Sequence, residues 1–249
     1  MNDHEKQMGL VDPQALFQQS TPELNPWNLS YRKALAAQPS WVQHGMPPLS
    51  DKFIELVKGA SRDGIHLDIG CGNGIKTVNF ALAGLKTIGV DISLDAIKEA
   101  KLLLDGHKLR NKCTFIEGSG LDLKFPQDSI DSATDILCFT HINDRDQAQY
   151  LRGIHNVLRN DGYFMLTLFS DQDEHFHGHP VSKKYVFHYD PNTMEQGYEH
   201  YEGMYNFHFG MKDIQEIFRG LFDITGAVHT RHPLYPHRYL WNVILQKDK

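Results

Sequence analysis

The residues with the clearest chemical potential form a glycine-rich loop and an aspartate that follows it. The loop reads Asp68-Ile69-Gly70-Cys71-Gly72-Asn73-Gly74 and directly follows the apolar run Ile65–Ile69. Glycine lets the backbone turn tightly and approach a ligand closely, and a helix that starts there presents unpaired N–H groups. Seventeen residues after Gly74, Asp91 ends the next apolar run, where a carboxylate can accept two hydrogen bonds from a ribose diol. The spacing therefore indicates a site for a cofactor that contains ribose.

Two kinds of cofactor use such an arrangement, and a purely structural role is the third possibility. The dinucleotide fingerprint is G-x-G-x-x-G, but the third glycine of this chain, Gly74, comes one residue early. An acidic residue, Asp68, also stands ahead of the first glycine, which fits that fingerprint badly. In the structural alternative, Asp68 caps the following helix and the loop binds no ligand.

The elements that must position the loop alternate between strand and helix signals over residues 64–170. The apolar periodicity predicts strands over 65–69, 87–91, 113–117, 129–139 and 163–169, with helices over 75–82, 93–100 and 147–158. A helix from Ser50 precedes them, and a helix over 212–222 with two strands over 222–229 and 239–246 closes the chain. Repeated β-α units with short loops predict an α/β fold with a doubly wound, mostly parallel sheet of seven strands.

Length and composition narrow the class of protein. The 249 residues, 41% of them hydrophobic, suit one elaborated domain. The net charge of −6 argues against nucleic acid, whose partners carry a basic excess. Cys71, Cys113 and Cys138 have no spacing that indicates a disulfide framework or a zinc site. No apolar run approaches the roughly 20 residues that span a bilayer, so a cytoplasmic protein without a membrane segment is expected.

The loop resembles the first motif of the class I S-adenosylmethionine (SAM) methyltransferases. Three further stretches resemble the same family: Glu117–Leu123 with Phe125-Pro126, Ile130–Ile142, and Asn156–Phe164. The resemblance covers about residues 51–170 and the closing strands more loosely. It implies a Rossmann-like fold, SAM as the cofactor and methyltransferase activity (EC 2.1.1.-).

The resemblance also implies which residues hold the cofactor. The ammonium of its amino-acid end would face Asp68 or the carbonyl groups near Gly70, and Asp91 would bind its ribose. Ser119 stands where many relatives have an aspartate that binds the adenine amino group, so its hydroxyl is expected there instead. The implied cofactor-binding set is Asp68, Gly70, Cys71, Gly72, Asn73, Gly74, Asp91, Ile92, Ser119, Gly120, Leu121 and Asp135.

Two segments are candidates for the acceptor side. Trp27 and Tyr31, with the run from Pro39 to Pro48 that contains Trp41, resemble the lead of the thiopurine, halide/thiol and tellurite-resistance branch. In that branch the segment closes over cofactor and acceptor; simple packing onto the domain is the alternative. Residues 171–210, inserted after the fifth strand, are rich in aromatic side chains such as Tyr205. They either line an acceptor pocket or form an ordinary packed core.

Single residues complete the candidate chemistry. His141 follows the fourth strand and is the best candidate for a general base, because histidine titrates near working pH; a structural role is the alternative. Arg238 either binds an acidic acceptor or is solvated. His175, His177 and His179 alternate along one segment, but a loop with Gly and Pro favours surface histidines, and no metal is predicted.

These readings divide the chain into an N-terminal cap segment (1–50) and a SAM-binding domain (51–249) with residues 171–210 as an inserted acceptor cap. The predicted function is methyl transfer from SAM to O, N or S of a small-molecule acceptor. One alternative is a SAM-binding sensor or partner subunit without catalysis. Another is a protein or RNA methyltransferase, although Ile136–Phe139 lacks the [N/D]-P-P-[F/Y/W] run of base-amine enzymes. The sequence leaves the acceptor and the oligomeric state open.

Overall fold

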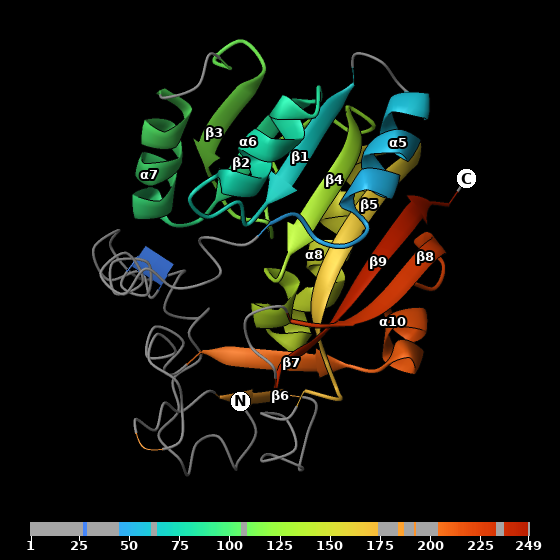
Figure 1. Ribbon diagram of the computed structural model, residues 1–249. Coiled ribbons are helices and arrows are strands. Elements are labelled where there is room, and N and C mark those ends of the chain that lie inside the picture. Colours follow the sequence, from blue (N-terminus) through green and yellow to red (C-terminus); the bar gives the residue numbers. More distant parts are fainter. Residues whose placement is uncertain are drawn as a thin grey trace.

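A twisted, mostly parallel sheet with helices on both faces forms the body of the protein (Figure 1). The computed structural model describes residues 27–28, 45–60, 64–105, 109–173, 184–186, 192, 204–232 and 237–248. Five parallel strands lie in the order β3-β2-β1-β4-β5. Their bounds are β1 Ile65–Ile69, β2 Lys86–Asp91, β3 Cys113–Glu117, β4 Ile130–Ile136 and β5 Leu158–Ser170.

Two antiparallel strands complete the sheet beyond β5. β9 (Tyr239–Lys247) pairs antiparallel with β5 on one side and with β8 (Phe222–Arg231) on the other. The predicted doubly wound, mostly parallel sheet is therefore confirmed, including the antiparallel pairing of the two closing strands.

The inserted segment adds sheet structure that the sequence pattern did not predict. β7 (Tyr205–Phe209) runs parallel to the end of β5, and β6 (Lys184–Val186) pairs antiparallel with β7. The sheet thus has nine strands among the described residues rather than the seven expected. All five residues of β7 are buried. Apolar and polar residues alternate along it, but Asn206 and His208 are enclosed as well as the aromatic residues, so neither face is exposed.

The helices lie in two layers. Their bounds are α5 Ser50–Ala60, α6 Ile75–Leu82, α7 Leu94–Asp105, α8 Asp144–Val157 and α10 Met211–Phe218, with a short 3-10 turn at Phe139–His141. Phe53 of α5 and Phe80 of α6 pack with Met165 and Ile244 on one face of the sheet. Tyr150 and other side chains of α8 and α10 pack on the opposite face; helix α8 lies behind β4 and β5 in Figure 1. Both faces of the sheet are therefore covered, as its apolar strands require.

Three boundaries differ from prediction for local reasons. β4 ends at Ile136 because Leu137 has a left-handed φ of 71° and the chain turns. α8 starts at Asp144, where the Asn143 side chain accepts a hydrogen bond from the Arg145 amide. β5 begins at Leu158 rather than at Tyr163 because Leu158 already pairs with Ile130 of β4. A bulge then separates this pair from the regular pairing that starts at Ser132 and Tyr163.

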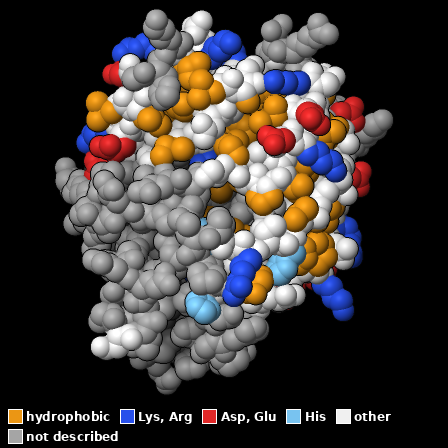
Figure 2. Space-filling model, in the orientation of Figure 1, with side chains coloured by type: hydrophobic (Ala, Val, Ile, Leu, Met, Phe, Trp, Pro, Cys, Tyr) orange, Lys and Arg blue, Asp and Glu red, His pale blue; other side chains and the backbone are white. Residues whose placement is uncertain are grey.

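The surface shows the mixture of hydrophobic and charged residues that the composition indicates. Figure 2 shows one face, on which hydrophobic side chains are interspersed with charged ones of both signs. Within the described part of the chain, no helix has both the length and the apolar character needed to cross a membrane.

Candidate cofactor and acceptor site

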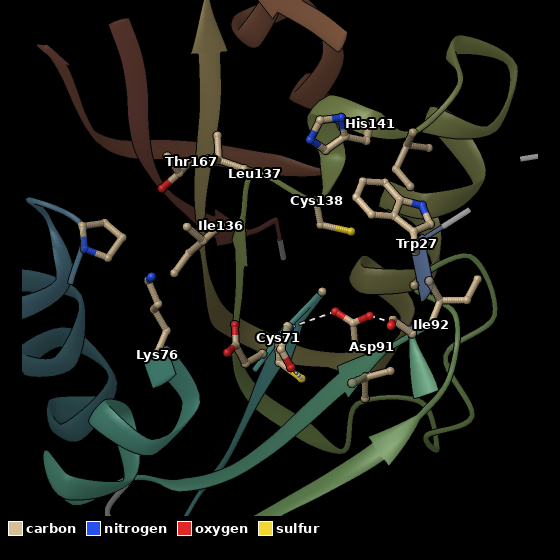
Figure 3. A pocket seen from close by; sticks show the side chains of 18 of the residues that line it. Trp27, Cys71, Lys76, Asp91, Ile92, Ile136, Leu137, Cys138, His141 and Thr167 are labelled. Atoms are coloured by element: carbon tan, nitrogen blue, oxygen red, sulfur yellow. Dashed lines mark hydrogen bonds between the residues drawn. The ribbon is translucent and has the colours of Figure 1, made fainter. Parts of the chain in front are cut away.

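A cavity of about 690 Å³ opens where the parallel strands end (Figure 3). Its walls come from the glycine loop, the ends of β2, β4 and β8, the start of β9, the segment 118–122, and the N-terminal residues Trp27 and Gly45–Pro48. Ligands of open α/β sheets bind at this edge, and the volume is in the range of small-molecule sites. The cavity is therefore the candidate site.

Most of the residues predicted to bind the cofactor line this cavity. They are Asp68, Gly70, Cys71, Gly72, Asn73, Asp91, Ile92, Ser119, Gly120 and Leu121. The structure thus places most of the predicted cofactor-binding residues in the wall of one cavity. Gly74 and Asp135 lie elsewhere, for reasons given below.

The glycine loop is held against the end of β2. The amides of Gly70 and Cys71 both donate to the Val90 carbonyl, at 2.8 and 3.1 Å. Gly70 has a φ of 69°, and a Cβ on it would lie 2.6 Å from Cβ of Cys138. Because both the backbone angle and the close approach exclude a side chain, the loop can lie flat against the cavity.

Gly74 serves helix packing rather than the cavity. It precedes α6 with a φ of 79°, and a Cβ would lie 2.4 Å from the Phe115 ring of β3. The prediction that this third glycine contacts the cofactor is therefore revised. Its conformation starts α6, and its lack of a side chain lets the helix approach β3.

Asp91 lies at the end of β2 with its half-buried carboxylate facing the cavity. One oxygen accepts from the Gly72 amide and the other from the Ser93 amide, each at 2.8 Å (Figure 3). Burial raises the pKa of Asp91 to about 6, opposed by these two hydrogen bonds. Each carboxylate oxygen can accept a second hydrogen bond, so Asp91 can receive two ligand hydroxyl groups without releasing the loop.

Asp68 is a buried carboxylate at the floor of the cavity. It accepts hydrogen bonds from the Thr77 hydroxyl of α6 at 2.6 Å and from the Thr134 hydroxyl of β4 at 2.8 Å. Burial raises its pKa, while the two hydroxyls and the charge of Lys76 oppose the increase. Asp68 therefore joins three elements below the loop and places a negative charge at this end of the cavity.

The segment after β3 forms the wall beyond Asp91. The Ser119 hydroxyl accepts from the Leu121 amide at 3.2 Å, which shapes the turn and leaves the hydroxyl hydrogen for another acceptor. Gly120 packs against the Tyr150 ring so closely that a Cβ would lie 2.4 Å from it. The segment 118–122 is therefore packed tightly against α8, and its residues form one wall of the cavity.

Asp135 is set behind the cavity wall. Its carboxylate accepts from the Tyr150 hydroxyl and from the amides of Cys138 and Phe139. Burial raises its pKa to about 7. The prediction that Asp135 contacts the cofactor is therefore revised, because its oxygens hold the turn after β4 in place.

His141 lines the cavity and has one ring nitrogen already fixed. Its Nδ1 lies 2.8 Å from the Tyr205 carbonyl. A carbonyl can only accept, so Nδ1 carries the hydrogen and Nε2 is the basic nitrogen of the neutral ring. The ring contacts Trp27 edge-on, with centroids 5.1 Å apart. The structure therefore brings together His141 and Trp27, two candidate acceptor-side residues that are 114 residues apart in the sequence.

Two residues predicted to bind the acceptor do not line the cavity. The Tyr205 ring is buried in the core, and only its carbonyl reaches His141. Arg238 is buried rather than solvated: its Nε lies 3.1 Å from the Asp173 carboxylate, and its guanidinium lies over the Phe169 ring at 4.3 Å. Its charge is therefore committed to an internal ion pair.

Several predictions fall outside the described residues. They concern Tyr31, Trp41, His175, His177 and His179. Within the part of the chain that the structure does describe, no cluster of His, Cys, Asp or Glu has the arrangement of a metal site.

Sequence reasoning missed some residues that line the cavity. These are Lys76 of α6, Thr167 of β5, Thr230 and Arg231 of β8, and Asn242 of β9. Thr167 and Asn242 are buried polar residues within apolar strands, which is a signal that could have been read. Nothing in the local pattern marks Lys76 as facing inward.

The strand order, the glycine loop after β1 and the carboxylate after β2 define the fold of the class I SAM-dependent methyltransferases. The comparison with known families agrees. Residues 67–166 match the family model described as a methyltransferase domain. Residues 67–166, about two fifths of the chain, are therefore similar to a methyltransferase domain, in the region where the sequence resembles that family.

Individual relatives match over parts of their length. The protein arginine N-methyltransferase 1 of Schizosaccharomyces pombe is 38% identical over 71 residues, which are 28% of this chain and 21% of that protein. The matches with curated relatives cover between 21 and 45% of those proteins' lengths.

Solved structures match over most of the chain. A SAM-dependent methyltransferase from Methanosarcina mazei has a TM-score of 0.67 at 21% identity and covers 82% of this chain and 99% of its own. The 1,6-didemethyltoxoflavin-N1-methyltransferase of Burkholderia thailandensis, solved with that compound and S-adenosylhomocysteine, has a TM-score of 0.65 at 17% identity. It covers 92% of each chain, so the likeness extends beyond the domain core.

Proposed function

We propose that this protein is a methyltransferase that uses SAM to methylate an oxygen, nitrogen or sulfur atom of a small molecule. The observation that carries the proposal is the single cavity that combines the glycine loop and Asp91 with a second wall containing His141 and Trp27. One part fits a nucleoside with an amino-acid end. The other leaves enclosed space for a second molecule.

The residues fit SAM at several points. Asp91 can accept from the ribose hydroxyls, and the turn at Ser119 and Gly120 can lie against the adenine. Gly70 and Gly120, where a Cβ would clash with Cys138 and Tyr150, let the two segments that would hold SAM pack closely against the rest of the domain. SAM supplies a methyl group that is already activated on a sulfonium sulfur. The protein must therefore mainly add proximity, alignment and exclusion of water.

His141 is the residue we propose as general base. An acceptor hydroxyl or thiol must lose a proton during transfer, whereas a neutral amine does not need a base. The Tyr205 carbonyl fixes the tautomer so that Nε2 can take this proton. Because His141 lines the cavity on the Trp27 side, the proton would be removed at the acceptor wall.

A small molecule suits the cavity better than a macromolecule. The net charge of −6 disfavours nucleic acid. The neighbour from Burkholderia thailandensis holds a small heterocycle, whereas the relative from Schizosaccharomyces pombe is a protein arginine N-methyltransferase and so favours the macromolecular alternative. All three cysteines are free, which suits the reducing cytoplasm.

The test combines binding with transfer. Calorimetry with S-adenosylhomocysteine should give a stoichiometric complex. Incubation with methyl-labelled SAM and a panel of phenols, thiols, amines and oxyanions should label at least one compound. His141→Gln should lower kcat for hydroxyl and thiol acceptors by about 10²–10⁴-fold while leaving the affinity for S-adenosylhomocysteine unchanged.

The same experiment separates the alternatives. Tight binding without transfer to any compound favours a sensor or partner subunit. Label in protein or RNA from an extract, but not in small molecules, favours a macromolecular acceptor. No binding of S-adenosylhomocysteine by the folded protein refutes the proposal.

A further inference from the structure

The end of the cavity that lies away from Ile92 contains a cationic side chain. Lys76, in the first turn of α6, extends into the cavity toward Ile136 and Thr167, whereas Asp91 and Ile92 lie on the other side (Figure 3). Burial lowers the pKa of the Lys76 ammonium, and the charge of Asp68 acts in the opposite direction. Asp68 itself already accepts hydrogen bonds from two threonine hydroxyls. The ammonium is thus held in a confined, partly desolvated place.

A set of hydrogen-bonding side chains crosses three strands at the same cavity. The Thr167 hydroxyl of β5 donates to Oδ1 of Asn242 on β9, and Nδ2 of Asn242 donates to the Thr230 hydroxyl oxygen on β8, each at 3.1 Å. All three residues line the cavity. Each bond is donated in the direction from β5 to β9 to β8, so Thr230 only accepts. Its hydroxyl hydrogen is therefore not used within this set. The orientation of the amide is therefore fixed, and the wall presents donors.

We propose that Lys76, together with the Thr167–Asn242–Thr230 set, binds a carboxylate group. This inference rests on the proposed function. An ammonium is complemented best by an anionic oxygen, and charge-assisted hydrogen bonds are about twice as strong as neutral ones. The donors on the strand wall can complete the shell of such a group. A confined, partly dehydrated site also favours a charged partner over water.

Two sources can supply the carboxylate. One is the α-carboxylate of the cofactor, since the cavity runs from Asp91 past Cys71 to Lys76 (Figure 3). Its ammonium would then lie near Asp68, and its carboxylate near Lys76. The other source is an acidic acceptor lying between Lys76 and the strand wall. The chemistry is the same, and the two are separated by experiment.

The first arm of the test concerns the cofactor. Calorimetry on the full chain measures the affinities for S-adenosylhomocysteine and for its decarboxylated analogue. The proteins compared are the wild type, Lys76→Met and Lys76→Arg. Lys101→Met, at an exposed position of α7, is the control. If the cofactor supplies the carboxylate, the wild type prefers S-adenosylhomocysteine by at least tenfold. Lys76→Met removes this preference without changing the affinity for the analogue. Lys76→Arg and Lys101→Met keep it.

The second arm concerns the acceptor. Protein saturated with S-adenosylhomocysteine is titrated with 4-hydroxybenzoate, 1-hydroxy-2-naphthoate and the primary amide of each. If the acceptor supplies the carboxylate, at least one acid binds tenfold more tightly than its amide. Lys76→Met abolishes that difference and Thr167→Val reduces it, while thermal melting reports whether each variant is folded.

The outcomes are distinct. A carboxylate preference that depends on Lys76 in either arm supports the proposal and identifies the source. Equal affinity for S-adenosylhomocysteine and its analogue, together with acids no better than amides, overturns it. A wild type that binds neither nucleoside refutes the proposed function instead.

Discussion

At the scale of single residues, Asp91 is the proposed link between the glycine loop and the ligand. Its two oxygens already accept from the Gly72 and Ser93 amides before any ligand binds. The carboxylate therefore orders the loop and the start of α7 around itself. A site that is arranged in advance loses less conformational freedom on binding, so the contribution of Asp91 to affinity should exceed that of its two ligand hydrogen bonds.

We expect the affinity for S-adenosylhomocysteine to depend on pH through Asp91. Its pKa is raised to about 6 by burial, and ligand hydroxyls donate to the ionised form. Binding thus lowers this pKa, so affinity is full above pH 6 and is lost as the pH falls through 6, by up to about tenfold per unit. Calorimetry at pH 7.5, 6.0 and 5.0 measures this.

Asp91→Asn is the variant that tests this assignment, because it removes the titrating carboxylate. It should weaken binding by at least about tenfold, because it removes charge-assisted hydrogen bonds worth about 1.5–3 kcal/mol each, and the remaining affinity should be flat with pH. Asp105→Asn, at an exposed position of α7, is the control. A wild type whose affinity does not change between pH 7.5 and 5.0 contradicts the assignment.

At the scale of elements, close packing fixes where the loop and the turn after β4 lie. Gly74 lets α6 approach Phe115 of β3. On the other side, the Tyr150 hydroxyl of α8 donates to the Asp135 carboxylate, whose oxygens also hold the turn. The cavity is thus shaped by contacts between residues that do not line it themselves.

Gly74→Ala should destabilise the fold. The residue needs a φ of 79°, and its Cβ would lie 2.4 Å from the Phe115 ring. A left-handed non-glycine residue costs about 1–3 kcal/mol, and overpacking adds about the same. Urea unfolding should show a total loss of about 2–6 kcal/mol in the free energy of unfolding. Phe115→Leu in the same chain should recover part of it, and full recovery would show that the backbone angle costs nothing.

Tyr150→Phe should reduce stability in a pH-dependent manner. The lost hydroxyl leaves the Asp135 carboxylate with amide donors only, at a cost of about 1–3 kcal/mol. Burial raises the pKa of Asp135 to about 7, and the donor stabilises the ionised form most. The loss should therefore be larger at pH 8 than at pH 5.5 in urea unfolding. An equal loss at both pH values would contradict the ionisation of Asp135.

At the scale of the whole molecule, a short N-terminal stretch joins the two sides of the cavity. Trp27 contacts His141 on the acceptor side. Its neighbour Asn28 accepts from the Ser93 hydroxyl at 2.7 Å and from the Asp95 amide at 3.3 Å, at the start of α7. Both contacts fit the proposal that the N-terminal segment closes over the site. The buried Asp173–Arg238 pair similarly fixes the root of the proposed acceptor cap, residues 171–210.

We expect Trp27→Ala and Asn28→Ala to act differently on turnover and on cofactor release. Trp27→Ala removes a wall next to His141 and should raise KM for the acceptor by about tenfold. Asn28→Ala removes the contact with Ser93 and should mainly speed the dissociation of S-adenosylhomocysteine, measured by stopped-flow fluorescence. If both variants keep wild-type KM and dissociation rates, the segment is packing only.

The sequence by itself determined the fold and most of the residues that line the cavity where we propose the cofactor binds. Glycines before α6, an acid after β2 and regular β-α alternation are local features, and each depends on backbone geometry within a few residues. Those features predicted that Gly70, Gly72 and Asp91 lie together at the carboxyl edge of the sheet, where all three line the cavity. The family resemblance extended this to the segment at Ser119.

Only the tertiary structure decided which polar side chains face the cavity and which are used internally. Arg238 reads as an exposed arginine near a turn, yet it is buried on Phe169 and paired with Asp173, 65 residues earlier in the chain. Lys76 reads as an exposed lysine on a helix, yet it faces the cavity. A side chain's burial and charge partners depend on elements that meet through long-range packing, and a local pattern holds no record of those contacts.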